Sequence, residues 1–347
     1  MSAAAPGARS RRANTRRAAR ETLRSGDAPV LHITNGGATQ QPLERSGVAG
    51  TIASWDDVLH EGPTPLLEGD DWLQARVRYL ASAGYGDEEE MLRDFRELGD
   101  PLDDAASHDE VVFWFEHDLH CQLLLTRHLW WLSRHRPSST RLSIVMGPDH
   151  LGLLKPADFP ARFAARRAIT DEQIAVGAEI WTAYCGDDPR RLLPFLDSTT
   201  VGRVLPSVPP AIHRLLEEFP GEATGLGRSE RQILDVLSDG PRTPEQAFVA
   251  CATREEDIWM GDWSFWTIAK RLAGGAHPLV AADVRPEPGR VPSGTLAITA
   301  AGRRVLAGDA DHLALNEPSR WIGGTCLAPP RVWRWTGSSL RPPAPGS

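Results

Sequence analysis

The clearest hydrophobic pattern in this chain is a short apolar run that leads directly into an apolar stripe at helical spacing. Val111–Phe115 is apolar throughout, which is typical of a buried strand. Leucines and tryptophans between Leu123 and Leu132 then recur at intervals that predict a helix. A strand that runs into a helix has its junction at the carboxyl edge of a sheet, where open α/β folds bind ligands. We therefore expect a ligand site at this junction.

Strands and helices alternate through the first part of the chain. Apolar runs predict strands at Val30–Thr34, Thr51–Ser54 and Arg141–Met146. Helical periodicity predicts helices at Asp70–Ala83 and Asp87–Leu98. Because strands that alternate with helices form βαβ units, we expect a mostly parallel sheet with right-handed crossovers.

The last third of the chain has a different rhythm, in which helices come first, then a hairpin, then one more helix. This order is that of a winged helix. The predicted elements are the helices Ser229–Leu237, Thr243–Ala250 and Asp262–Leu272, the hairpin strands Leu279–Val284 and Thr295–Ile298, and the helix Thr299–Leu306.

These patterns divide the 347 residues into five parts. We expect an α/β domain with a mostly parallel sheet at 29–150, a helical connector at 151–224 and a winged-helix-like α+β domain with a C-terminal staple at 225–335. A disordered tail is predicted at 336–347. Residues 1–28 carry seven arginines and two acids, and we expect a disordered leader there. A basic arm that touches nucleic acid and a targeting peptide are the alternatives.

Composition changes this picture little. Apolar residues make up 41% and charged residues 24% of the chain, as in ordinary globular proteins. No apolar run approaches the roughly 20 residues that span a bilayer, so we expect no membrane partner. The net charge of −8 gives no general attraction to nucleic acid. The four cysteines are widely spaced, which argues against a disulfide framework and favours the reducing cytoplasm.

Two polar segments follow the first two predicted strands. The stretch from His32 to Gly36 ends in Asn-Gly, and backbone N–H groups at such a turn can approach an anion. A simple tight turn is the alternative. The loop 56–63 carries three carboxylates and His60 beside a Gly-Pro turn. It is typical either of a loop that faces a ligand or of carboxylates that cap a turn beside a solvated histidine.

The junction itself carries the densest chemistry. His117 lies three residues before His120 and four before Cys121, so the three share a face if the helix begins near His117. This spacing suits a transition-metal site, or a general acid–base pair of His117 with Asp118. The structural alternative is that Asp118 caps the helix and Cys121 packs as a small hydrophobe. We favour the acid–base pair and predict no metal.

A fourth segment, Asn316–Leu327, carries Arg320, whose guanidinium can hold a carboxylate or phosphate through two parallel bonds. The alternative is a C-terminal extension that staples two domains together. The expected site residues are His117 as general base, Asp118 as its orienting partner and His60 in the catalytic set, with ligand contacts from His32, Thr34, Asn35, Gly36, Glu61, Gln122 and Arg320.

A winged helix raises the hypothesis of a DNA-binding regulator, because its third helix usually enters the major groove. The charges argue against it here. Between Gly225 and Asp309 ten Lys and Arg residues stand against eleven Asp and Glu residues, whereas a phosphate-binding surface is basic. The third helix also begins with Asp262 and Trp263, so acidic and aromatic residues stand where base-reading residues are expected. We therefore expect a packing or protein-contact role rather than a nucleic-acid partner.

Seven motifs distributed over the chain can be compared with a known family. They are LHITNG at 31–36, WDDVLHEGP at 55–63, WFEHDL at 114–119, EEFP at 217–220, GLGRSERQIL at 225–234, MGDWSFW at 260–266 and RWIGG at 320–324. Together they resemble a bacterial family known as domain of unknown function 1835 (DUF1835), with its usual DUF3658-like companion domain. The resemblance spans Val30 to Trp335. It implies an α/β N-terminal domain and a helical C-terminal one, and no particular activity.

The chain departs from the pattern of that family at three positions. The first motif usually continues with an acidic residue, where this chain has Gly37, and the junction motif has one where Cys121 stands. The RWIGG motif is usually followed by a histidine, where this chain has Cys326. If these positions carry chemistry in the family, this protein has an altered or inactive site.

The sequence thus leads to a cytoplasmic enzyme or enzyme-like protein. It would bind a small anionic ligand, of phosphate or nucleotide type, at the carboxyl edge of the N-terminal sheet. Two alternatives stay open: a ligand-sensing winged-helix transcriptional regulator, and an inactive scaffold or protein-interaction module. The charge balance counts against the first, and the replaced acidic positions favour the second. No motif identifies a cofactor or an oligomeric state.

Overall fold

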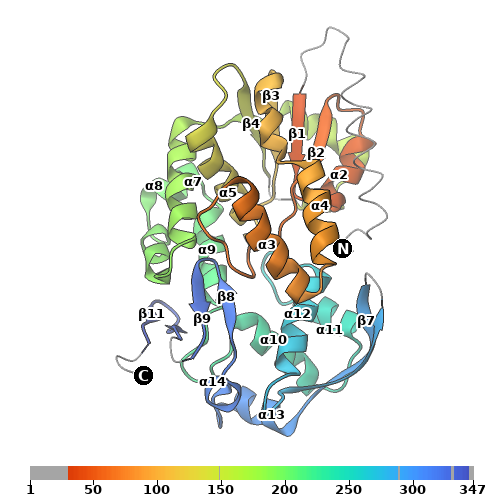
Figure 1. Ribbon diagram of the computed structural model, residues 1–347, viewed down its shortest axis with the longest axis vertical. Coiled ribbons are helices and arrows are strands. Elements are labelled where there is room, and N and C mark those ends of the chain that lie inside the picture. The colour runs from red at the N-terminus through yellow and green to blue at the C-terminus, as the bar shows by residue number, and fades with distance from the viewer. Residues whose placement is uncertain (1–29, 148, 288–289, 330–331, 344–347) are drawn as a thin grey trace.

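The N-terminal part of the protein is built on a five-stranded sheet with the strand order β2-β1-β3-β4-β5 (Figure 1). The computed structural model describes residues 30–147, 149–287, 290–329 and 332–343, so the predicted leader lies outside the described residues. Strands β1 to β4 are parallel, and β5 pairs antiparallel with β4. The predicted α/β sheet is confirmed. The strands are β1 (Val30–Thr34), β2 (Thr51–Ser54), β3 (Glu110–Trp114), β4 (Arg141–Val145) and β5 (Arg167–Ala168).

The strand order makes β1 and β3 neighbours, although β2 lies between them in the chain. The chain leaves β1 to form β2 on one side, and then returns past β1 to form β3 and β4 on the other. The carboxyl ends of β1 and β3 are therefore the switch point at which open α/β sheets bind ligands. The predicted junction lies at this point. Strand β2 is left at the edge, and no described strand pairs with its outer side.

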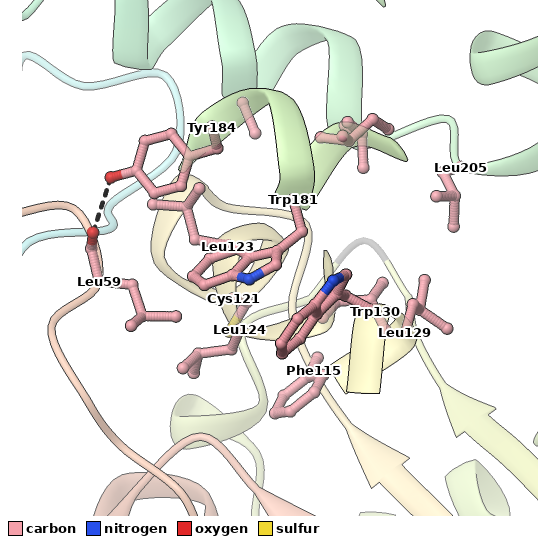
Figure 2. Close-up of a cluster of buried hydrophobic side chains, with 14 of the residues drawn as sticks. Leu59, Phe115, Cys121, Leu123, Leu124, Leu129, Trp130, Trp181, Tyr184 and Leu205 are labelled. Carbon is pink, nitrogen blue, oxygen red and sulfur yellow. Dashed lines mark hydrogen bonds between the residues drawn. The ribbon is translucent and has the colours of Figure 1, made fainter. Parts of the chain in front are cut away.

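One face of the sheet is covered by three helices. Helix α5 (Leu119–His135) packs against α7 (Asp171–Tyr184) and α9 (Val208–Leu216). Their apolar side chains form the largest core together with Ile33 and Phe113 of the strands. Figure 2 shows a part of this core, with side chains of α5 and α7 packed on one another. This face of the sheet is closed to water.

The opposite face has a smaller core. Val112 and Trp114 of β3 point to this side, where they pack with α2 (Gly37–Glu44) and α6 (Phe159–Ala164). Strands buried on both faces are apolar at nearly every position, unlike strands with one wet face. This explains the continuous apolar run from which the junction was predicted.

A helical hairpin stands beside the edge strand. Its helices, α3 (Gly69–Ala83) and α4 (Glu88–Leu98), pack against each other. Asp87 caps α4 by accepting a hydrogen bond from the N–H of Glu90. Short elements complete this part: 3-10 helices at Pro101–Ser107, Leu151–Leu153, Pro156–Asp158 and Pro189–Phe195, and α8 (Thr199–Val204).

The C-terminal part, below the sheet in Figure 1, follows the predicted order of three helices, a hairpin and a helix. It has its own core, which includes Ile233, Phe265 and Leu296. An antiparallel bridge also joins Arg242 to Leu296. The elements are α10 (Arg228–Ser238), α11 (Pro244–Ala252), α12 (Asp262–Leu272), β6 (Val280–Glu287), β7 (Arg290–Ile298), α13 (Ala300–Ala307) and α14 (His312–Asn316).

The RWIGG segment forms a hairpin of β8 (Arg320–Ile322) and β9 (Thr325–Leu327). Its turn rests on the end of α7, where the N–H of Gly324 donates to the carbonyl oxygen of Tyr184 at 2.9 Å. A Cβ atom on Gly324 would lie 1.9 Å from the carbonyl oxygen of Cys185. The close approach of two backbones thus requires glycine here.

Beyond this hairpin, β10 (Arg334–Trp335) pairs with β11 (Leu340–Arg341). Part of the tail predicted at 336–347 is therefore a strand, and 344–347 lie outside the described residues. None of the helices in the described ranges combines the length and apolar character needed to cross a membrane.

Candidate functional site

The predicted junction lies at the carboxyl edge of the sheet, but its helix begins later than the spacing suggested. Asp118 is the N-cap of α5, and its Oδ1 accepts a hydrogen bond from the N–H of Cys121 at 3.1 Å. His117 therefore precedes the helix and does not share a helical face with Cys121. The structure gives Asp118 the capping role that was the alternative to acid–base chemistry.

His117 contacts the C-terminal part of the protein. Its Nε2 lies 2.9 Å from Oδ1 of Asp257, in the loop between α11 and α12. Its ring centroid lies 5.1 Å from that of His150. The expected orienting pair with Asp118 is not formed, and the histidine joins the two parts of the chain instead.

Glu116 fixes the turn that follows β4. Its carboxylate accepts hydrogen bonds from Nδ1 of His150 at 2.7 Å and from the N–H of Leu151 at 3.0 Å. Nε2 of Gln122 donates to the backbone oxygen of Glu116 at 2.6 Å. Gln122, expected as a ligand contact, thus holds the connection between β3 and α5.

Glu116, Asp118 and Cys121 form a compact buried group, whose oxygen and sulfur atoms lie within 4.8 Å of one another. Nδ2 of Asn35, at the end of β1, donates to Sγ of Cys121 at 3.0 Å. Burial raises the pKa of the Cys121 thiol well above its usual value, and the two carboxylates raise it further. Burial also raises the pKa of Asp118. Because nucleophilic attack needs a thiolate, this environment disfavours Cys121 as a nucleophile.

His60 is part of the contact between the two parts of the protein. Its Nε2 lies 3.1 Å from Oγ of Ser264 in α12, and its ring centroid lies 4.8 Å from that of Trp259. The ring of His120 is 5.9 Å away. Burial lowers the pKa of His60 to about 4, so the ring is neutral at pH 7.

The Glu61 carboxylate accepts hydrogen bonds from four hydroxyl groups. Two come from the α3–α4 hairpin and two from α12. Burial alone raises its pKa, but the nearby His60 and the hydroxyls outweigh burial and lower it. An ionised carboxylate with four donors is a structural anchor rather than an open ligand contact. The donors are Tyr79 at 3.0 Å, Tyr85, Ser264 at 2.8 Å and Thr267 at 3.0 Å.

The side chains of β1 do not gather at the junction. His32 faces the smaller core, where its Nδ1 accepts a hydrogen bond from Nε1 of Trp114 at 3.0 Å. Burial lowers its pKa, so it is a neutral core histidine. Thr34 donates to a backbone oxygen of β2. Of the residues expected from this strand, Asn35 and Gly36 lie at the switch point, with Gly36 as the N-cap of α2.

Arg320 lies in a buried ionic cluster. Its Nη1 is 3.5 Å from Glu230 and 3.8 Å from Glu218, and Nη2 donates to the backbone oxygen of Glu218. Although burial opposes ionisation of Glu230, Arg320 and Arg271 lower its pKa to about 2. The guanidinium is occupied by protein carboxylates, as the stapling alternative requires.

A cavity of about 680 Å³ lies along the edge strand β2, away from the junction. The continuous stretch Gly50–Val58 forms one wall, and α3, α4 and α5 contribute the others. None of the expected catalytic or ligand residues lines it. From the motif segments, Trp55, Asp56 and Asp57 do.

Arg127 of α5 lines this cavity and is only 3% exposed. Its guanidinium carbon lies 5.2 to 5.5 Å from the ring centroids of Trp55, Trp72 and Trp130. Its ion-pair contact is a long one, 4.0 Å to Oδ2 of Asp100. Its Nε has no hydrogen-bond partner among the described residues. Burial lowers its pKa, because the charged form of the side chain is less stable away from water.

A second arginine of the cavity wall, Arg76, has a full set of partners. It bonds both carboxylate oxygens of Asp57, at 2.7 and 2.8 Å, and the carbonyl oxygens of Val58, Glu61 and Pro63. Arg76 therefore shapes the loop behind β2, which is also held by the hydroxyl of Tyr184 on the carbonyl of Leu59 (Figure 2).

Two more polar atoms on the cavity wall, Oγ of Ser54 and Oε1 of Gln40, are buried and have no partner within the described ranges. Buried polar groups nearly always have partners in folded proteins. Three residues that line the cavity, from β2, α2 and α5, thus each carry a buried polar atom without a partner among the described residues.

Sequence reasoning missed this cavity, although one pattern pointed to it. Arg127 is the one cation inside the apolar stripe from Leu123 to Leu132. A buried cation needs a partner, and the sequence offers none at helical spacing on the same face. No sequence pattern marks β2 as an edge strand, because the place of a strand in the sheet depends on which strands pair.

Comparison with models of known protein families gives no match for this chain, and a search of curated proteins gives none either. The resemblance to DUF1835 therefore stays a prediction.

Proposed function

We propose that the protein binds a small organic anion with an apolar or aromatic body in the cavity along β2, and that Arg127 receives the anionic group. The observation that carries this proposal is the buried guanidinium of Arg127, which lines a cavity and, among the described residues, has its nearest ion-pair partner at 4.0 Å. Burial of a poorly paired charge costs free energy. A bound phosphate or carboxylate would offset that cost through charge-assisted bonds.

The walls of the cavity suit the rest of such a ligand. Ligand sites of about 300–1,000 Å³ are usually lined by apolar and aromatic side chains with a few polar groups. Here Trp55, Trp72 and Trp131 provide aromatic surface, and Ser54 and Gln40 provide polar atoms. The ligand class expected from the sequence is kept, but its site moves from the junction to the edge of the sheet.

The alternative of a DNA-binding regulator is disfavoured by the position of α12, the third helix of the winged-helix-like unit. Ser264 and Thr267 of this helix bond Glu61 of the N-terminal part. A helix whose residues are engaged in this way has that face unavailable to a DNA groove. We infer a packing role for it.

A thermal-shift screen tests the proposal. The panel consists of nucleoside monophosphates, sugar phosphates and aromatic carboxylates, applied to wild type, Arg127→Met and Arg96→Met. A ligand at 100 times its Kd stabilises wild type by about 2.7 kcal/mol. We expect that shift to vanish in Arg127→Met and to persist in Arg96→Met. Arg96 is a matched control because it also lines the cavity but is exposed and paired with Asp70.

A His117→Ala variant separates this site from the junction. If the ligand occupies the β2 cavity, the shift persists in this variant. A shift that disappears with His117 and survives Arg127→Met would place the ligand at the junction and overturn the proposal. So would the absence of any shift across the whole panel.

A further inference from the structure

Two carboxyl groups and a thiol meet at the junction, away from water. Glu116, Asp118 and Cys121 are 5%, 4% and 0% exposed. One oxygen or sulfur atom from each lies within 4.8 Å of the other two. All three belong to the stretch 116–121, which joins the end of β3 to the first turn of α5. A short piece of backbone at the switch point of the sheet thus brings three possible metal ligands together.

The charge of Asp118 has no cationic partner nearby. Its Oδ1 accepts the capping bond from the N–H of Cys121, which uses one of its two oxygens. The side chain forms no ion pair with any residue that the structure describes, although it is almost fully buried. Charges buried in folded proteins are paired or coordinate metal ions. A cation between Asp118 and Glu116 would meet this requirement.

The amide of Asn35, at the end of β1, points to the same place through a separate observation. Its Nδ2 donates to Sγ of Cys121 at 3.0 Å. Its Oδ1 is buried and has no hydrogen-bond partner in the described part of the chain. Buried polar atoms nearly always have a partner. A water molecule on a metal ion beside the sulfur would give this oxygen the donor that it lacks.

The surroundings hold the three side chains in place. Nδ1 of His150 and the N–H of Leu151 donate to the carboxylate of Glu116 and fix its orientation. Cys121 belongs to the largest apolar core, part of which is drawn in Figure 2. Hydrogen bonds to a ligating carboxylate and an apolar shell are both usual around metal sites, where they orient the ligands and limit the access of water.

The donor atoms indicate the class of ion. Magnesium and calcium take oxygen ligands, whereas thiolates favour softer ions such as zinc. Zinc binds cysteine sulfur at about 2.3 Å and carboxylate oxygen at about 2.0–2.2 Å. Ligand atoms around a tetrahedral ion of this size lie about 3.5 Å apart. The three atoms, already within 4.8 Å of one another, therefore reach a common ion through small side-chain rotations.

We propose that Glu116, Asp118 and Cys121 bind a zinc ion, with a water molecule in the fourth position beside Oδ1 of Asn35. The ion replaces the thiol proton, which leaves to solvent, because zinc deprotonates a coordinating thiol. Three protein ligands and one open position are the arrangement of catalytic zinc sites.

This inference departs from the expectation of no metal, and it also differs from the metal alternative considered for the sequence. That alternative used His117 and His120 together with Cys121, whereas the structure groups the thiol with two carboxylates. The zinc site does not use the β2 cavity, so its outcome is independent of the proposed function.

Zinc titration of the full chain tests the inference. The protein is stripped with EDTA, kept reduced and titrated with Zn²⁺ in competition with a chromophoric chelator. We expect wild type to bind one ion per chain. Asp118→Asn and Cys121→Ala lower the zinc affinity at least about 100-fold, since changes to outer-shell partners alone cost about 10–100-fold. Absence of a bound ion in wild type, or wild-type affinity in either variant, would overturn the inference.

Two variants carry the same chemical changes elsewhere in the chain. Asp87→Asn alters the N-cap of α4. Because Asn caps a helix about as well as Asp, both cap variants are expected to fold. Cys251→Ala removes a buried thiol from the core of the C-terminal part. Both controls keep the wild-type zinc affinity. An equal loss of affinity in the controls would contradict a site at the junction.

Cobalt reports the identity of the ligands independently of the affinity. Co²⁺ bound to a thiolate absorbs in the near ultraviolet through sulfur-to-metal charge transfer. We expect this band in wild type and Cys251→Ala, and its loss in Cys121→Ala. A wild-type protein that binds Co²⁺ without the band would hold the ion through other ligands, and the assignment of Cys121 would be wrong.

Discussion

Arg76 and Arg127 are both buried on the wall of one cavity, but only the first has close partners for its charge. Arg76 has two carboxylate bonds and three carbonyl bonds. Arg127 has aromatic rings and one distant carboxylate. At the scale of the residue, this difference separates a group that holds the fold together from one whose charge has no close carboxylate among the described residues, which is the basis of the proposed anion site.

The free energy of unfolding distinguishes the two roles. Removal of one partner of a well-bonded buried pair usually costs about 3–5 kcal/mol, whereas replacement of a buried charge that has no close partner also removes the cost of keeping that charge away from water. We expect Arg76→Met to lose about 3–5 kcal/mol in urea unfolding. Arg127→Met stays within about 1 kcal/mol of wild type or gains stability. A loss of more than about 3 kcal/mol in Arg127→Met would show that this cation is structural.

At the scale of the element, the sequence was informative where one pattern decides the outcome. The continuous apolar run located β3 because this strand is buried on both faces. Helical periodicity located α4 to within one residue of its first position. The beginning of α5 was misjudged because His117 and Asp118 are both compatible with a first turn, and the cap decides between them. The hairpin β8–β9 was missed because it is stabilised by its backbone contact with the end of α7, which lies far away in the sequence.

The same hairpin supports a prediction. A Cβ atom on Gly324 would collide with the backbone of α7, at 1.9 Å from the oxygen of Cys185. We expect Gly324→Ala to lower the melting temperature, with a loss of at least about 2 kcal/mol, typical of overpacking. Gly202, inside α8, is the matched control, since a Cβ atom there would have no neighbour within 4 Å among the described residues. Gly202→Ala should be neutral or gain up to about 1 kcal/mol. Equal effects of the two changes would show that the hairpin yields to the methyl group.

At the scale of the whole molecule, residues that looked catalytic in the sequence form the contact between its two parts. His60, Glu61 and His117 each bond a residue of the C-terminal part. Polar residues of one motif cannot reveal partners that lie more than a hundred positions away. Histidines and carboxylates that suggest a catalytic site in the sequence can therefore also form contacts between two parts of a protein. Only the three-dimensional structure distinguishes the two roles.

Acid should weaken this contact. Burial lowers the pKa of His60 to about 4, while an unfolded histidine has a pKa of about 6.5. Between these values the unfolded chain binds more protons than the folded one, so stability present above pH 6.5 is lost as the pH falls toward 4. By pH 5 this residue alone accounts for about 2 kcal/mol. In urea unfolding, we expect the free energy of unfolding to fall less between pH 7 and 5 in His60→Asn than in wild type, by about that amount. Parallel pH profiles for the variant and wild type would contradict this assignment.

The four hydroxyls around Glu61 also limit how the chain can be shortened. The cut that looks natural from the order of the elements, just before α10, would leave a fragment with the whole sheet and the whole β2 cavity. In that fragment the carboxylate of Glu61 would lose the hydrogen bonds from Ser264 and Thr267. The side chain of His60 would lose its contact with Ser264 and become exposed to solvent. The smallest self-sufficient version of this protein therefore contains both parts, and the distant helix α12 belongs to the N-terminal unit as much as to its own.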